Sequence, residues 1–214
     1  PTIRPTVSEI TRKSYVTENN CHAGVHHPVE RGVKYNSEIH HRRSIRLKGY
    51  DYSRAGAYFI TICTQNRECL SGDILDGVMR LNDAGEIVAD EWLKTAAIRH
   101  EIELDVWVVM PNHFHGVVVI VNSGTTVDCR GDRPVAPTGP QPRSVGAVMA
   151  GFKSAVTKRI NEYHQTPGAK LWQRNYYENI IRDEMELKNI RGYIQNNPLL
   201  WETDSLFPKI ESTE

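Results

Sequence analysis

The stretch that decides the fold is ELDVWVVMPNHFHGVVVIV, residues 103–121. Its two halves are rich in valine and isoleucine, which favour β-strands, and Pro111-Asn112 between them is a turn signal. The stretch therefore predicts an antiparallel hairpin. Because successive side chains of a strand point to opposite faces, His113 and His115 would lie side by side on one face, with Phe114 on the other.

Two imidazoles at the start of a valine-rich strand need partners. Burying either one without a hydrogen bond costs on the order of 1–3 kcal/mol. One interpretation makes His113 and His115 satisfied polar residues at a sheet edge. The other is a divalent metal ion, since imidazole is a common metal ligand and alternate strand positions bring two of them to one ion. The spacing by itself leaves both open.

The remaining elements follow from composition and periodicity. AGAYFITICTQ (residues 55–65) and KLWQRNYYENII (residues 170–181) predict strands, and residues 71–85 are rich in turn formers. Three helices are predicted from apolar stripes. The first begins at a cap, Asn82 or Asp83, and its stripe is Ile87, Trp92 and Ile98; the second has the stripe Val145, Val148, Met149, Phe152, Val156 and Ile160. The third begins at a capping box formed by Asp183 and Glu186, has the stripe Leu187, Ile190 and Ile194, and ends near Pro198. The order β, α, β-β, α, β, α predicts an α+β fold with helices covering an antiparallel sheet.

The domain boundaries come from where this periodicity stops. Residues 1–38 show no sustained pattern and are expected to form an N-terminal extension, either disordered or packed as an arm. The domain is expected to span residues 39–205. Within it, residues 122–144 are rich in Gly, Pro and Thr and predict a flexible loop, and residues 206–214 form a C-terminal tail.

The composition is that of an ordinary globular protein, with 39% hydrophobic and 24% charged residues in 214. The 4 cysteines include no C-x-x-C, which fits a reducing compartment and neither a disulfide framework nor a thiolate zinc site. No apolar run is long enough to span a membrane and no leader peptide opens the sequence, so a cytoplasmic location is expected.

The net charge of +0 argues mildly against a tight nonspecific DNA binder unless the charge is uneven. The charge is distributed unevenly, because a basic segment lies ahead of the first predicted strand. Tyr50 and Tyr52 are interleaved with this segment. Such a segment suits phosphate contact and base stacking, or is simply a solvated charge run. The candidate DNA-binding residues are Arg42, Arg43, Arg46 and Lys48, with Lys153, Lys158, Arg159 and Arg174 as further candidates.

A second motif, GYIQNNP (residues 192–198), ends the last predicted helix. Tyr193 and Asn197 are four residues apart and therefore lie on one helical face. One interpretation makes Tyr193 a half-buried aromatic residue and Asn197 a C-terminal cap. The other makes Tyr193 a nucleophile and the amide oxygen of Asn197 a third metal ligand, which would suit Mg²⁺ or Mn²⁺ better than two imidazoles alone.

PNHFHG after a strand, LWQRNYYENIIRDE further on and YIQNNP on the last helix together resemble the single-tyrosine HUH transposases, in particular the REP-associated tyrosine transposases. The match runs from about residue 42 to about residue 201. The resemblance implies a ferredoxin-like or RRM-like sheet, a divalent metal (Mg²⁺ or Mn²⁺) on His113, His115 and Asn197, and Tyr193 as nucleophile. It further implies a nucleoid-associated enzyme that cuts single-stranded DNA beside hairpins or inverted repeats and holds the 5′ end on the tyrosine.

Alternatives remain at the level of sequence. Tyr176 and Tyr177 on the expected strand suit packing or base stacking better than attack, and Trp172 suits the core. A non-catalytic nucleic-acid-binding module and a metal hydrolase that uses water are the rival functions. The choice between monomer and homodimer, the DNA sequence recognised and the metal stay open. The long extension, the long loop and the zero net charge depart from the family and put substrate choice and mobility in doubt.

Overall fold

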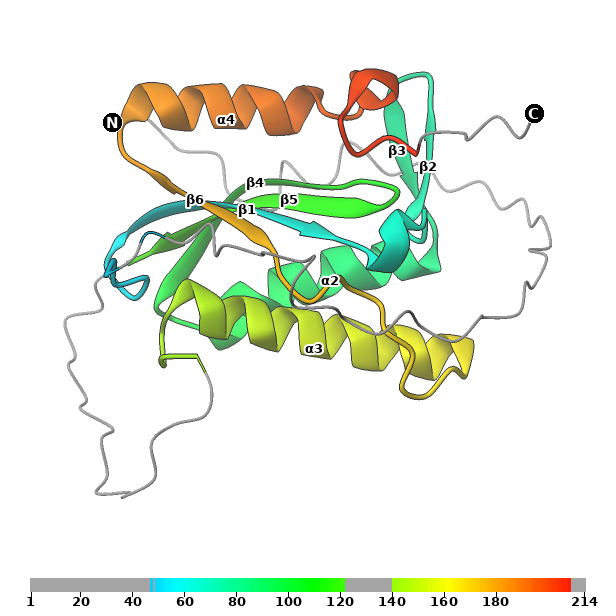
Figure 1. Cartoon of the computed structure of the whole chain (residues 1–214), viewed down its shortest axis with the longest axis horizontal. Coiled ribbons are helices and arrows are strands. Elements are labelled where there is room, and N and C mark those ends of the chain that lie inside the picture. Colours follow the sequence, from blue (N-terminus) through cyan, green and yellow to red (C-terminus); the bar gives the residue numbers. More distant parts are fainter. Residues whose placement is uncertain (1–46, 48, 122–139, 209–214) are drawn as a thin grey trace, which may run out of the picture. The chain divides into compact units, whose positions relative to one another are not determined.

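The computed structural model describes residues 47, 49–121 and 140–208. Its centre is an antiparallel sheet with the strand order β4-β5-β1-β6 (Figure 1). The strands are β1 (Gly56–Cys63), β4 (Ile102–Val109), β5 (His113–Ile120) and β6 (Tyr177–Ile181). β4 and β5 form the hairpin that the sequence predicts, with the chain turning through Pro111 and Asn112. β5 pairs along its whole length with β1, so the histidine strand lies in the middle of the sheet.

Three α-helices flank the sheet in the described part of the chain. α2 (Asp83–Ile98) and α3 (Val145–His164) cover one face, and α4 (Glu184–Asn196) lies across the other (Figure 1). With the strand order above, β1-α2-β4-β5-α3-β6 is the ferredoxin-like βαββαβ arrangement, which confirms the expected fold class. Two short 3₁₀ helices, η1 (Gln65–Arg67) and η2 (Trp201–Thr203), follow β1 and α4.

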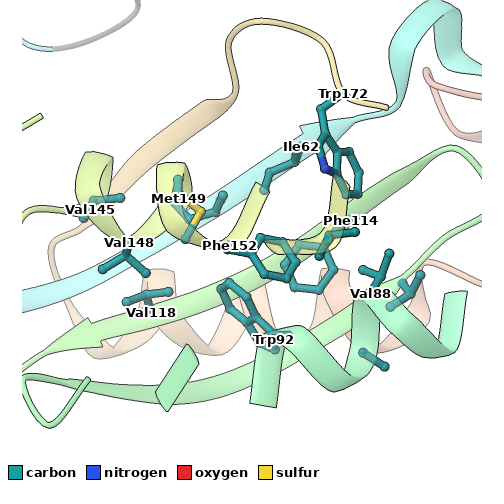
Figure 2. Close-up of a cluster of buried hydrophobic side chains, with 14 of the residues drawn as sticks. Ile62, Val88, Trp92, Phe114, Val118, Val145, Val148, Met149, Phe152 and Trp172 are labelled. Carbon is teal, nitrogen blue, oxygen red and sulfur yellow. The ribbon is translucent and has the colours of Figure 1, made fainter. Parts of the chain in front are cut away.

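The larger apolar core lies between the sheet and the helices α2 and α3 (Figure 2). Trp92 of α2 packs edge-on against Phe114 of β5, with ring centroids 4.6 Å apart, and against Phe152 of α3 at 5.1 Å. Gly116 makes this approach possible, because a Cβ there would lie 2.8 Å from Cζ2 of Trp92. The stripe predicted on α3 is buried in full, from Val145 to Ile160.

The opposite face of the sheet carries a smaller apolar cluster under α4. Phe59 and Val117 of the sheet pack there against Ile194, with Leu187 and Ile190 beside them. Those three helix residues form the stripe predicted from the sequence. Because His113 and His115 alternate with Phe114 along β5, both imidazoles lie on this α4 face, while Phe114 enters the larger core.

Several details differ from the sequence prediction. The turn-rich stretch contains a second hairpin, β2 (Gly72–Leu75) and β3 (Val78–Leu81). Its Asp76-Gly77 turn has positive φ at both residues (53° and 72°), which is the pattern of a tight hairpin turn and could have been read from the sequence. The last strand, β6, begins only at Tyr177. Ile98 is 75% exposed, so the stripe predicted for the first helix is wrong at its end; Val88 and Trp92 form the buried side instead.

The predicted caps of α2 and α4 are confirmed. The side chain of Asn82 accepts a hydrogen bond from the backbone N–H of Gly85 and begins α2. The side chain of Asp183 accepts one from Glu186 and begins α4, and Ser144, at the end of the predicted 122–144 loop, caps α3 in the same way.

The predicted extension (residues 1–38), most of the basic segment, residues 122–139 of the loop and residues 209–214 of the tail lie outside the described residues. Within the residues that are described, no helix combines the length and the apolar character needed to cross a membrane.

Candidate active site

The two histidines of β5 lie next to each other and are almost fully buried, His113 at 1% exposure and His115 at 2%. Their ring centroids are 4.5 Å apart. β1 and β4 flank β5, so neighbouring strands shield both imidazoles from the sides. The strand thus directs two nitrogen donors into the same small space under the C-terminal half of α4.

Asn112 fixes the protonation of His113. Its amide nitrogen donates hydrogen bonds to the backbone oxygens of Arg67 (3.2 Å) and Leu206 (2.8 Å), which determines the orientation of the amide. The amide oxygen therefore faces Nδ1 of His113 at 2.8 Å and accepts from it. The proton of the neutral ring is on Nδ1, and the lone pair of Nε2 is free for a cation.

His115 has an equivalent partner on the neighbouring strand. Its Nδ1 lies 2.8 Å from the hydroxyl oxygen of Thr61, which is paired with His115 in the β1–β5 register. On the other side of the ring, Nε2 lies 3.2 Å from the phenolic oxygen of Tyr193. If the phenol donates to Nε2, the ring proton is on Nδ1 and Thr61 accepts it. Because the Thr61 hydroxyl can equally donate to Nδ1, these two contacts satisfy either tautomer of His115.

Tyr193 reaches the site from α4. Ile194, the next residue, is the fully buried contact of the helix with the sheet, and Tyr193 lies beside it with 43% of its surface exposed. Its ring packs edge-on against Phe59, with centroids 6.1 Å apart. Tyr193 therefore contacts the histidine strand and is also partly open to solvent.

Asn197, at the end of α4, completes the side facing His113. Only 1% of its surface is exposed, and its amide nitrogen donates to a carboxylate oxygen of Asp204 at 3.1 Å. This leaves the amide oxygen of Asn197 and Nε2 of His113 buried without a hydrogen-bond partner. Two unpaired buried acceptors in one small space are costly by themselves and fit a cation between them. Asn197 is also the residue that caps α4, as one interpretation of the sequence predicts; its role as a metal ligand stays a prediction.

Asp204 is a residue that the sequence reasoning missed. It follows η2, and one of its oxygens lies within 4.8 Å of the ring nitrogens of His113 and His115, which themselves lie within that distance of each other. The chain returns to the site at this point because Trp201 is buried against His113, with ring centroids 5.8 Å apart. No local pattern marks Asp204, since its position depends on this return.

The electrostatics of the site favour neutral imidazoles. Burial lowers the pKa of His113 to about 4. The negative charge of Asp204 and the nearby side chain of Asn197 act in the opposite direction and raise this pKa. Burial and then the neighbouring His113 lower the pKa of His115 well below its ordinary value. Burial and then the charge of Asp204 raise the pKa of Tyr193. The histidines are therefore in the form that binds metal, and the phenol needs a nearby positive charge to ionise.

The predicted DNA-binding residues are not brought to this site in the described part of the chain. Lys153 donates to the backbone oxygens of Gln173 (2.7 Å) and Arg174 (3.3 Å), so it fixes the segment before β6. Arg159 pairs with Glu91 at 2.7 Å and joins α3 to α2. Arg174 is exposed. Arg42, Arg43, Arg46 and Lys48 lie outside the described residues, and their contact with DNA stays a prediction.

Most of the aromatic residues weighed in the sequence pack in or against the larger core. Tyr50 and Tyr52 pack edge-on against each other, with centroids 5.0 Å apart, and lie against the larger core. Trp172 is buried, as predicted, and Tyr176 packs against the same core. Tyr177 is exposed on the opposite face, 6.2 Å from the ring of Phe59. Tyr193 differs from them because its hydroxyl approaches a histidine of the pair, Nε2 of His115, at 3.2 Å.

Fold and site together define an α+β protein of ferredoxin-like topology with a candidate metal centre of two histidines and a carboxylate under a tyrosine-bearing helix. No family model matches the chain. An uncharacterized protein of Haemophilus influenzae is 42% identical over 181 residues, which cover 82% of this chain and 98% of that protein. The chain belongs to the same family as this protein.

Two solved structures are similar to 72% of this chain. One is a REP-associated tyrosine transposase bound to a REP hairpin, with a TM-score of 0.48, 19% identity and 73% of that chain covered. The other is a candidate transposase from Deinococcus radiodurans, with a TM-score of 0.40, 18% identity and 97% of that chain covered.

Proposed function

We propose that the protein is a metal-dependent, single-strand DNA endonuclease and strand transferase in which Tyr193 is the nucleophile. The observation that carries the proposal is the 3.2 Å approach of the Tyr193 hydroxyl to Nε2 of His115, within a site that also gathers His113, Asn197 and Asp204. The same residues were expected from the resemblance of PNHFHG and YIQNNP to single-tyrosine HUH transposases; Asp204 is added by the geometry.

The chemistry of the donor set fits a divalent cation. His113 and His115 would contribute Nε2, and Asn197 and Asp204 would contribute oxygens. A mixed set of nitrogen and oxygen donors suits Mn²⁺ and similar ions, and the amide and carboxylate oxygens also make it hospitable to Mg²⁺. When bound, such an ion supplies the positive charge that stabilises a phosphodiester under attack.

Tyr193 would act on the phosphorus of the scissile phosphodiester. The phenolic oxygen, after losing its proton to water, forms a bond to phosphorus while the bond from phosphorus to the 3′ oxygen breaks. The departing oxygen takes a proton from water and becomes a 3′-hydroxyl. The 5′ end stays on Tyr193 as a phosphodiester, so a second 3′-hydroxyl can reverse the step and join strands without a further energy source.

The position of the tyrosine favours this reaction over the rival functions. A hydrolase that uses water would leave a free 5′-phosphate and has no need of a phenol beside the histidines. A non-catalytic binding module would have no need of two neutral buried imidazoles side by side, one of them with its Nδ1 proton oriented by Asn112. DNA with hairpins or inverted repeats is the proposed substrate, and the basic segment containing Arg42, Arg43, Arg46 and Lys48 is the proposed contact for its phosphates.

The test is incubation of the full chain with a single-stranded hairpin oligonucleotide and Mn²⁺ or Mg²⁺, followed by denaturing electrophoresis. Label on the 3′ side of the cleavage point should migrate with the protein, whereas label on the 5′ side should be released as a shorter oligonucleotide. Tyr193→Phe should lose the covalent band and retain DNA binding, while Tyr177→Phe serves as a matched control. Free 5′-phosphate without any adduct would instead indicate the hydrolase, and metal-independent binding without cleavage would indicate the binding module.

A further inference from the structure

The helix that carries Tyr193 is held to the sheet by few contacts. Ile194 is the one buried residue of α4, and Leu187 and Ile190 are half-buried beside it. At the start of the helix, Glu186 accepts hydrogen bonds from Asn179 (2.7 Å) and the backbone of Arg182 (2.9 Å). A narrow apolar stripe of this kind restrains the rotation of a helix about its own axis less than a broad one does.

A salt bridge in the second half of α4 opposes this roll. Arg191 donates from Nε to both oxygens of Asp105 (3.2 and 3.1 Å) and from Nη2 to one of them at 2.5 Å. Asp105 lies on β4 where the pairing with β5 shifts register between Leu104 and Trp107. Such a bulge redirects a side chain from its regular position, and here the carboxylate meets the helix. The planar guanidinium binds a carboxylate in a fixed orientation.

The helical geometry couples this ion pair to the tyrosine. Successive residues of an α-helix are separated by about 100° around the axis. Ile190 and Ile194 form the stripe that faces the sheet, so Arg191 lies on one flank of the stripe and Tyr193 on the other. A roll of the helix that releases Arg191 from Asp105 would therefore move the phenol relative to Nε2 of His115.

We infer that the Asp105–Arg191 ion pair positions the nucleophile. The ion pair fixes the rotation of α4 about its axis, and this rotation places the Tyr193 oxygen beside the metal-binding nitrogens of the histidines. This inference rests on the proposed function. Neither residue is a catalytic residue, since neither contacts the reacting atoms. The Arg191 side chain of the ion pair is about half exposed, and exposed ion pairs contribute little to folding stability. Loss of the ion pair should therefore change the rate of the covalent step rather than the stability of the fold.

The experiment compares Arg191→Ala, Asp105→Ala and the exchanged pair Asp105→Arg with Arg191→Asp, using Lys188→Ala as control. Lys188 is an exposed cation on the same helix, so its removal reproduces the change in charge without touching Asp105.

Both single variants should slow single-turnover adduct formation by about 10- to 100-fold, the effect of a small misplacement of a reacting group. Their affinity for hairpin DNA should stay within about two-fold, and their melting temperatures within about 4 °C of the wild type. The exchanged pair should recover part of the rate, and Lys188→Ala should retain it.

A phosphate-binding role for Arg191 would give the opposite pattern. Arg191→Ala would then weaken DNA binding, and Asp105→Ala, which removes a negative charge, would strengthen it. That pattern, or unchanged adduct formation in both single variants, would overturn the inference.

A second readout needs neither DNA nor metal. The ¹⁵N resonance of Nε2 in His115 reports the hydrogen bond between this nitrogen and Tyr193. In Arg191→Ala and Asp105→Ala the resonance should shift towards the value found in Tyr193→Phe. In Lys188→Ala it should stay at the wild-type value. Absence of an adduct in the wild type would contradict the proposed function. The resonance would still decide whether the ion pair positions the phenol, since an unchanged signal in both variants would count against it.

Discussion

The phenolic oxygen of Tyr193 lies 3.2 Å from Nε2 of His115, although 78 residues separate them along the chain. The contact joins the middle strand of the sheet to the helix on its outer face, and it forms within a single chain. His113, Asn197 and Asp204 surround it with further nitrogen and oxygen donors.

Asn112→Ala should weaken metal binding by about 10- to 100-fold, the usual effect of losing the partner that orients a histidine ligand. The variant removes the acceptor for Nδ1–H of His113, so the ring proton is no longer held away from Nε2. Isothermal titration of the apo protein with Mn²⁺ measures the affinity. Asn189→Ala on the exposed side of α4 is the control, and equal affinity in all three proteins would contradict the assignment of the tautomer.

Asp204→Asn should lower the affinity for Mn²⁺ and also lower the pKa of Tyr193. The first effect follows because a carboxylate oxygen near both imidazoles becomes a neutral amide. The second follows because the charge of Asp204 contributes to raising the pKa of the phenol. Titration calorimetry and the ultraviolet absorbance of the phenolate measure the two effects. Glu202→Gln removes a neighbouring exposed charge and should change neither; a metal affinity unchanged by Asp204→Asn would remove Asp204 from the site.

The metal-free protein should lose stability as the pH falls from about 6.5 to about 4. Burial lowers the pKa of His113 in the folded state from 6.5 to about 4, so in this window the unfolded chain binds a proton that the folded chain does not. Acidification therefore favours unfolding, by about 3 kcal/mol for His113 across the whole window. Urea unfolding in EDTA at several pH values measures this. His113→Gln should reduce the slope, and a free energy of unfolding that is independent of pH would contradict burial of neutral histidines.

Replacing Arg42, Arg43, Arg46 and Lys48 together by alanine should weaken DNA binding and reduce its salt dependence. If each cation neutralises one phosphate of a single strand, the slope of log affinity against log salt concentration should fall by about 3 in magnitude. Fluorescence anisotropy at several salt concentrations measures the slope. Replacing Lys153 is a useful comparison, because its amino group is already bound to two backbone oxygens and should contribute little.

The sequence was most informative where local patterns decide local structure. The β4–β5 hairpin was predicted from valine-rich strands around Pro111-Asn112, and α3 and α4 were predicted from their stripes and from the cap at Asp183. The relation of His113 to His115 also followed from alternation along one strand. The β2–β3 hairpin was missed because its strands are only four residues each, although Asp76-Gly77 marks the turn.

What the sequence could not show depends on contacts between distant segments. Asp204 reaches the histidines because Trp201 packs against His113, and this packing has no periodic signature. The role of Asn112 likewise depends on the backbone oxygens of Arg67 and Leu206, which come from different parts of the chain. Spacing predicts a buried Ile98, whereas its side chain in the last turn of α2 is 75% exposed.

The most direct test of Tyr193 as the nucleophile is mass spectrometry of the protein after reaction with a single-stranded hairpin oligonucleotide and Mn²⁺, nuclease trimming and proteolysis. The peptide containing Tyr193 should carry a nucleotide joined through its 5′-phosphate to the phenolic oxygen. A nucleotide on Tyr176, Tyr177 or another residue, or cleaved DNA with no modified peptide, would contradict that role.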